Sequence, residues 1–291
     1  MKISLTFALL LLFPASIAAE TLNPQAYDLL KSFYAYDKSY PLRAEIAGTI
    51  RHEGYSFERL TFESFHGGTA TGLIALPEQG QAPYPVVLLL HGLSGNKKQW
   101  LGDAFTSGGE VTRGLLRAGY AVLALDAQYH GDRSIYNRHI DVGDMVFNRG
   151  WGVRYANMLT QSVVDYRRAM DYLATREDFD PTRIGVLGYS MGGHMTFMLG
   201  AVEERVKVVV ACVVPHMSGM PMAATSFAAD LGRVDLLMLM GSRDRYYSTE
   251  QAESLFKAVP GNNKELRFFD SGHSLPIEYV EQAVNWISGK L

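Results

Sequence analysis

Long apolar runs recur from residue 84 onward, and they constrain the fold more than any other feature of the chain. The runs are YPVVLLLHG, AVLALDA, RIGVLGYS, VKVVVACVV, VDLLMLMGS and ELRFFDSGH. Runs of this kind are typical of strands buried on both faces of a mostly parallel sheet. Segments with apolar residues at helical spacing lie between them, at 110–118, 159–175, 191–199, 250–258 and 277–287. Strands that alternate with helices in this way predict a doubly wound α/β sheet.

Two further β-rich segments precede these runs. YSFERLTFES and TATGLIALPE are separated by His66-Gly67-Gly68 and are interpreted as an antiparallel pair. Asn23 and Pro24 form a helix start before QAYDLLKSFYAYD. The sequence therefore predicts an eight-stranded, mostly parallel sheet with helices on both faces. No internal repeat interrupts residues 20–291, so we expect a single domain.

The segment at about 129–155 is longer than an ordinary connection between a strand and a helix. It mixes His, Asp, Arg, Asn and aromatic residues. Long loops in compact domains often act as lids or binding loops. We interpret this segment as a lid-like insertion near the functional site, and the alternative is a surface excursion without a function.

The N-terminus has the three parts of a secretory signal peptide. A charged start at Lys2 is followed by the apolar run LTFALLLLF (5–13), Pro14 and the small residues of ASIAAE. We expect residues 1–19 to be a signal peptide that is cleaved after Ala18 or Ala19, which places the protein in a periplasm or outside the cell. The alternatives are a buried helix and a membrane anchor, but the run is too short to span a bilayer.

Charge and cysteine content narrow the classes of partner. The formal net charge is −3, from 27 basic and 30 acidic residues, and no basic block gives a footprint for nucleic acid. No segment has 18 uninterrupted apolar residues, so we expect no membrane span. Cys212 is the single cysteine, so neither an internal disulfide nor a cysteine-based metal site is possible, and we expect no metal site. The oligomeric state is left open.

The stretch GYSMG (188–192) has the G-x-S-x-G pattern. By itself this motif is weak, but a buried strand precedes it and a helical segment follows it. A serine on such a sharp turn is lifted above the sheet, and the glycines prevent clashes with neighbouring backbone. The positive end of the following helix favours negative charge at the serine oxygen. Ser190 is therefore the candidate nucleophile.

A serine hydroxyl needs a base, and the base needs a carboxylate to orient it. His273 lies just after LRFFD, and Asp244 lies just after LLMLMGS, so each follows a strand. The order Ser190, Asp244, His273 is the Ser–acid–His order of α/β folds with this motif. Asp270 and Asp235 are weaker candidates for the acid, because Asp235 begins its strand and Asp270 is three residues from the histidine. The other seven histidines are more typical of structural residues: His52, His66, His91, His130, His139, His194 and His216.

The stretch HGLSG (91–95) follows the third strand and predicts an oxyanion hole. Acyl transfer places negative charge on a carbonyl oxygen, which two backbone N–H groups can hold. The expected donors are the N–H groups of Leu93 and Met191, while His91 and Gly92 shape the turn. The alternative is a plain glycine turn.

Together, HGLSG, GYSMGG, GSRD and SGH resemble the oxyanion, nucleophile, acid and histidine motifs of the α/β-hydrolase superfamily, in order. The resemblance runs from about Tyr55 to the C-terminus and includes the loop LDAQYHGDRS. It is closest in character to dienelactone hydrolase-like and acetyl esterase-like enzymes. The resemblance implies a carboxylic-ester hydrolase without a cofactor, acting on a small-molecule ester. Dienelactone hydrolases proper use a cysteine nucleophile, so Ser190 favours a serine esterase over dienelactone activity.

Two rival functions remain open. One is a peptidase related to prolyl oligopeptidases, although the chain has no room for their propeller domain. The other is a non-catalytic binding protein on the same fold, which would not need all three groups of the triad. The methionines of PHMSGMPMAATSFAAD, at 217, 220 and 222, either line an acyl pocket or pack in the core. Arg133, Arg243 and Arg245 either meet an acidic substrate or are solvated.

Overall fold

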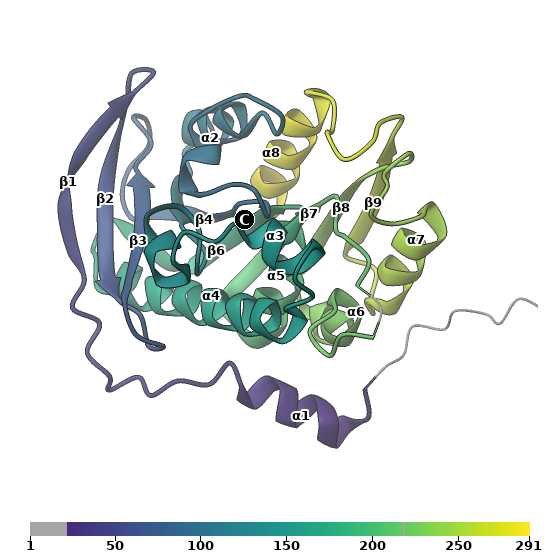
Figure 1. The fold of residues 1–291 in the computed structure, drawn as a ribbon. Coiled ribbons are helices and arrows are strands. Elements are labelled where there is room, and N and C mark those ends of the chain that lie inside the picture. Colours follow the sequence, from purple (N-terminus) through teal and green to yellow (C-terminus); the bar gives the residue numbers. More distant parts are fainter. Residues whose placement is uncertain (1–21, 218) are drawn as a thin grey trace, which may run out of the picture.

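The computed structural model describes residues 22–217 and 219–291. Within them, nine strands form one sheet in the order β1-β2-β3-β5-β4-β6-β7-β8-β9 (Figure 1). The strands are β1 (Glu45–His52), β2 (Tyr55–Glu63), β3 (Thr69–Ala75), β4 (Tyr84–Leu90), β5 (Ala121–Leu125), β6 (Phe179–Tyr189), β7 (Val206–Cys212), β8 (Asp235–Gly241) and β9 (Lys264–Phe269). The pairs β1–β2, β2–β3 and β3–β5 are antiparallel. The pairs β5–β4, β4–β6, β6–β7, β7–β8 and β8–β9 are parallel. The mostly parallel α/β sheet is confirmed.

Strand β1 is the ninth strand, which the sequence analysis missed. Its sequence, EIAGTIRH, contains no apolar run because it lies exposed at the edge of the sheet. The register against β2 shifts between Ile46 and Thr49, and Gly48 between them has a φ of +128°. Such a bulge interrupts the alternation by which half-buried strands are recognised.

Helices cover both faces of the sheet, as predicted (Figure 1). Among the described residues they are α1 (Pro24–Ser32), α2 (Gly108–Arg117), α3 (Val142–Phe147), α4 (Gly152–Leu173), α5 (Met191–Val202), α6 (Ala224–Phe227), α7 (Thr249–Ala258) and α8 (Glu278–Lys290), with 3-10 turns η1 (Lys97–Trp100), η2 (Gly131–Asn137) and η3 (Ala228–Arg233). Helices α2 and α8 pack together on one face, and α4 and α5 pack on the other. Helix α4 begins at Gly152 rather than at residue 159, so its first turns belong to the insertion at 129–155.

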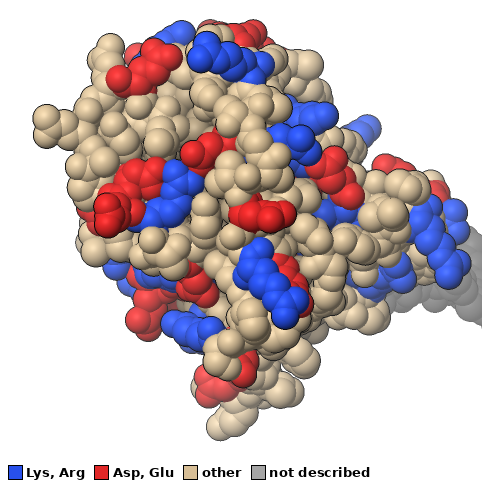
Figure 2. Space-filling view, turned by 90° about the vertical axis from the view of Figure 1, so that its left-hand side faces the viewer, with Lys and Arg blue, Asp and Glu red and all other residues tan. Residues whose placement is uncertain are grey.

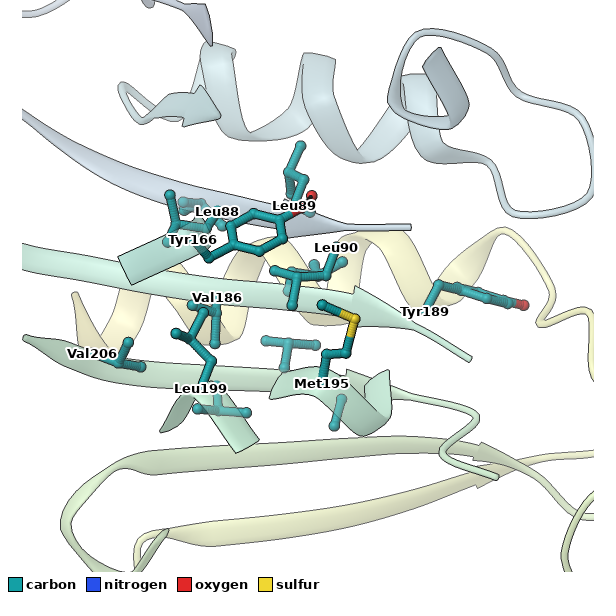
Figure 3. Close-up of a cluster of buried hydrophobic side chains, with 14 of the residues drawn as sticks. Leu88, Leu89, Leu90, Tyr166, Val186, Tyr189, Met195, Leu199 and Val206 are labelled. Atoms are coloured by element: carbon teal, nitrogen blue, oxygen red, sulfur yellow. Dashed lines mark hydrogen bonds between the residues drawn. The ribbon is translucent and has the colours of Figure 1, made fainter. Parts of the chain in front are cut away.

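The core is built where the central strands meet α4 and α5. Leu88 on β4, Val186 on β6 and Leu199 on α5 are fully buried (Figure 3). Burial of each such side chain contributes roughly 1.5–3 kcal/mol. Tyr166 of α4 donates its hydroxyl to the carbonyl oxygen of Leu89 at 2.8 Å, so its polar end is also satisfied. This packing holds the carboxyl ends of the strands, from which the site loops emerge.

On the face of the molecule at the β1 edge of the sheet, acidic and basic side chains are interspersed (Figure 2). No large patch of a single sign is visible on this face. No helix within the described residues is long and apolar enough to span a bilayer. The predicted signal peptide, residues 1–19, lies outside the described residues.

Candidate active site

Ser190 occupies a sharp turn between β6 and α5. Its φ is +57°, which is rare for a residue with a side chain, and its N–H donates to the carbonyl oxygen of Cys212 at 2.9 Å. A Cβ atom on Gly192 would lie 1.9 Å from the carbonyl oxygen of Leu90, and one on Gly188 would lie 2.2 Å from that of Gly192. The glycines of GYSMG are therefore required by close backbone contact, as the motif predicts.

His273 and Asp244 reach Ser190 from the loops after β9 and β8. His273 Nε2 lies 2.7 Å from Ser190 Oγ, and its Nδ1 lies 2.6 Å from Asp244 Oδ2. An Nδ1–H that donates to the carboxylate leaves Nε2 free to accept the serine proton. The structure thus brings the three predicted residues together in the order that proton transfer requires.

The rival carboxylates lie elsewhere. The Asp270 side chain is 86% exposed and pairs with Arg243. Asp235 begins β8, at the far end from the turn of Ser190, and its carboxylate lies 3.3 Å from Lys290 Nζ. Neither carboxylate hydrogen-bonds His273.

Asp244 is held in its ionised form. Its side chain is fully buried, and burial alone would raise its pKa. Hydrogen bonds from His273 and from the N–H of Tyr246, at 2.9 Å, outweigh burial and hold the pKa of Asp244 below its ordinary value. A buried carboxylate of this kind fixes the orientation of the imidazole.

Tyr189 connects the turn of Ser190 to the loop of His273, a role that the sequence analysis missed. Its hydroxyl donates to the carbonyl oxygen of His273 and accepts from the N–H of Leu275, each at 2.9 Å. Figure 3 shows the ring extending from the end of β6, beyond the core cluster. Because both partners are backbone groups far along the chain, no residue pattern reveals this contact.

The two predicted oxyanion donors belong to residues that line the cavity around Ser190. Leu93 and Met191 line one cavity with the serine. Leu93 N–H makes no backbone hydrogen bond within the described residues, and Met191 N–H begins α5, where intrahelical acceptors are lacking. Both donors are thus available to an oxygen atom bound above Ser190.

Side chains behind the HGLSG loop hold its shape. Gln99 Oε1 accepts from Gly92 N–H at 3.0 Å, and His130 Nε2 lies 2.8 Å from the carbonyl oxygen of Leu93. His91 Nδ1 lies 2.8 Å from the Gly92 oxygen, while its Nε2 accepts from Ala127 N–H at 3.0 Å. Burial and the neighbouring His130 lower the pKa of His91 to about 3, so this ring stays neutral. The sequence analysis assigned the turn to His91 and Gly92 and interpreted His130 as a structural residue, which its contact with Leu93 supports, but it missed Gln99.

The cavity around Ser190 has a volume of about 1330 Å³. Asp141, Asp144, Phe147 and Tyr155 line it, so the insertion at 129–155 borders the cavity. Within the parts of the chain that the structure describes, no group of three or more His, Cys, Asp or Glu residues is placed to hold a metal ion.

The structure places each of the methionines and arginines that the sequence left open. All three methionines pack against the core, and Met217 also lines the cavity. Arg243 and Arg245 line it too. The prediction was wrong for Arg133, which is fully buried and pairs with Asp165 at 2.7 Å, because η2 carries it into the protein.

Comparisons with known proteins agree with this architecture. A putative hydrolase, YtaP, from Bacillus subtilis (strain 168) is 30% identical over 181 residues, which cover 58% of this chain and 56% of the relative. Esterase FrsA from Yersinia enterocolitica is 26% identical over 166 residues, covering 57% of this chain and 33% of the relative. The chain thus spans little more than half of the first relative and a third of the second.

Solved structures and a family model extend the comparison. Acetyl xylan esterase 1 from Thermoanaerobacterium sp. JW/SL YS485 has a TM-score of 0.69 at 16% identity, covering 91% of this chain and 94% of that one. A cold-adapted esterase from an Arctic intertidal metagenomic library has a TM-score of 0.68 at 22% identity, covering 84% and 98%. Both likenesses show the α/β-hydrolase fold. A sequence model of the dienelactone hydrolase family matches residues 70–281, and the chain therefore belongs to that family.

Proposed function

We propose that this protein is a serine hydrolase that cleaves carboxylic esters of small molecules through an acyl-enzyme intermediate. The observation that carries the proposal is the pair of contacts at His273, 2.7 Å to Ser190 Oγ and 2.6 Å to Asp244 Oδ2. The names of the relatives and fold neighbours, several of which are esterases, support the reaction class.

The proposed reaction has two halves. His273 takes the proton of Ser190 as the serine oxygen attacks the ester carbonyl, and the N–H groups of Leu93 and Met191 hold the oxyanion. His273 then gives the proton to the leaving alcohol. Water, deprotonated by the same histidine, hydrolyses the acyl-enzyme and frees Ser190.

Labelling with a fluorophosphonate probe tests the nucleophile. We expect the wild type to be labelled at Ser190, identified by peptide mass mapping, and the His273→Ala variant to be labelled much more slowly because its serine lacks a base. Asp270→Asn is the matched control and should be labelled at the wild-type rate. Folded wild-type protein that stays unlabelled would favour a non-catalytic binding protein.

We also propose that residues 1–19 direct export to a periplasm or out of the cell. The proposal rests on the charged start, the short apolar run and the small residues before Glu20. Expression in a bacterium followed by cell fractionation tests it. Protein that starts at residue 19 or 20 in the periplasm or the medium would support export, and an intact Met1 form in the cytoplasm would contradict it.

A further inference from the structure

Apolar side chains form part of the walls of the cavity around Ser190. Leu93, Phe105, Val146, Phe147 and Met217 contribute to them. Phe105 and Phe147 are 62% and 63% exposed, so two aromatic rings stand open at the cavity. Walls of this kind bind an apolar body, and a few polar groups among them usually fix the orientation of a ligand.

Tyr155 is a buried polar side chain on these walls. It lies in the first turn of α4 and is 4% exposed, yet it lines the cavity. Its hydroxyl forms no hydrogen bond with a described residue. The hydroxyl oxygen is nevertheless not sealed inside the protein. The ring is therefore packed in the protein, and the hydroxyl meets the open volume.

Two acidic side chains of the insertion that line the cavity are already engaged. Asp141 accepts the N–H of Asp144 as the cap of α3, and Asp144 pairs with Arg149. Burial raises the pKa of the Tyr155 phenol, so it stays neutral at any working pH. A neutral phenol whose ring is buried normally finds a hydrogen-bond partner, and here the place for that partner is in the cavity.

We propose that the Tyr155 hydroxyl is a polar subsite that donates a hydrogen bond to an oxygen atom of the substrate remote from the scissile ester. The substrate would then be an ester with an apolar body, set against Phe105 and Phe147, and an ether, hydroxyl or carbonyl oxygen at the position of Tyr155. This inference rests on the proposed function of the cavity and adds a substrate class to it.

Ester pairs that differ in one oxygen atom test the subsite. The acyl series is p-nitrophenyl octanoate and its isosteres in which an oxygen replaces one methylene at successive positions. The alcohol series is octyl acetate and the acetates of the ether alcohols in which an oxygen replaces one methylene of octanol. The readout is the ratio of kcat/KM for each ether to kcat/KM for its alkyl partner. At the oxygen position that reaches Tyr155, we expect Tyr155→Phe to lower this ratio about fivefold, as loss of one neutral hydrogen bond predicts.

Tyr34→Phe is the matched control. Tyr34 is a fully buried tyrosine outside the cavity lining, and its hydroxyl also has no partner among the described residues. Its substitution should leave every ratio unchanged. Ratios that are the same in wild type and Tyr155→Phe at all oxygen positions in both series would overturn the subsite. An equal loss on every ester would also overturn it, because Tyr155 would then act on the reaction itself.

A binding measurement separates this inference from the proposed function. Saturation-transfer NMR compares binding of the same ether and alkyl esters to Ser190→Ala and to Ser190→Ala/Tyr155→Phe. A preference for one ether that depends on Tyr155 supports the subsite even if the wild type hydrolyses no ester, in which case only the proposed function fails. If hydrolysis depends on Ser190 but neither measurement shows a preference due to Tyr155, the proposed function stands and the subsite is overturned.

Discussion

His273 has two ring nitrogens with different partners, and the proposed chemistry depends on that difference. Nδ1 faces the buried carboxylate of Asp244, and Nε2 faces Ser190 Oγ. The carboxylate keeps the proton on Nδ1, so Nε2 has a lone pair for the serine proton. The proposed reaction therefore needs one tautomer of His273, and a single substitution at Asp244 can reverse the tautomer.

We predict that Asp244→Asn lowers kcat for ester hydrolysis by about 10³- to 10⁴-fold without unfolding the protein. An amide at this position presents either an N–H group or a weaker acceptor to Nδ1, and thus favours the wrong tautomer of His273. Steady-state kinetics with a p-nitrophenyl ester measures the loss. Asp270→Asn, whose carboxylate is exposed, should stay within about twofold of the wild type, and a larger loss there than at Asp244 would identify Asp270 as the acid.

At the scale of elements, the site depends on how the turn after β6 is joined to the loop after β9. Tyr189 forms that link with two hydrogen bonds to the backbone around His273. It touches the base through the main chain and is thus a positioning residue.

We predict that Tyr189→Phe lowers kcat about tenfold, because the histidine loop loses both bonds and samples unproductive positions. Tyr166→Phe is the matched control, since its hydroxyl bonds the core carbonyl of Leu89. Thermal unfolding should show a comparable stability loss in both variants, with kcat reduced in the first alone. An equal loss of kcat in the two variants would show that Tyr189 acts through stability.

The turn itself gives a prediction on stability. Gly192→Ala would place a Cβ atom 1.9 Å from the Leu90 carbonyl oxygen, whereas Gly289→Ala on α8 would meet nothing within 4 Å. We expect the first to lower the free energy of unfolding by about 2 kcal/mol or more and the second to change it by 0 to about +1 kcal/mol. Urea denaturation measures both. A tolerated alanine at 192 would show that the turn has room to move.

The sequence predicted those elements and residues that a local sequence pattern reveals. Ser190 has its motif, and Asp244 and His273 follow apolar runs, so chain order alone indicated the triad. Strand β1 was missed because it is exposed and bulged, and the early start of α4 was missed because residues 129–155 were interpreted as one long insertion. Tyr189 and His130 act through contacts between distant segments, which leave no signal in a single sequence.

At the scale of the whole molecule, several buried histidines make stability depend on pH. Burial lowers the pKa of His91 to about 3 and that of His194 to about 4, against 6.5 in the unfolded chain. Between these values the unfolded state binds protons that the folded state does not. The contribution of these histidines to the free energy of unfolding is therefore fully present above pH 6.5 and is lost as the pH falls.

We predict that the free energy of unfolding falls between pH 6.5 and pH 4, by up to about 1.4 kcal/mol per pH unit for each such histidine. Urea titrations across this range measure the slope. His194→Gln, which keeps a donor toward the Met222 carbonyl oxygen, should make the slope shallower. A slope that is unchanged in this variant would assign the pH dependence to other groups.

Hydrolysis of a p-nitrophenyl ester series, acetate to dodecanoate, by the wild type and by Ser190→Ala decides whether Ser190 is the nucleophile of an ester hydrolase. We predict turnover by the wild type and a loss of about 10⁶-fold in kcat for the variant, with the same thermal unfolding curve. Wild-type turnover by folded Ser190→Ala, or no turnover of any ester by the wild type, would contradict it.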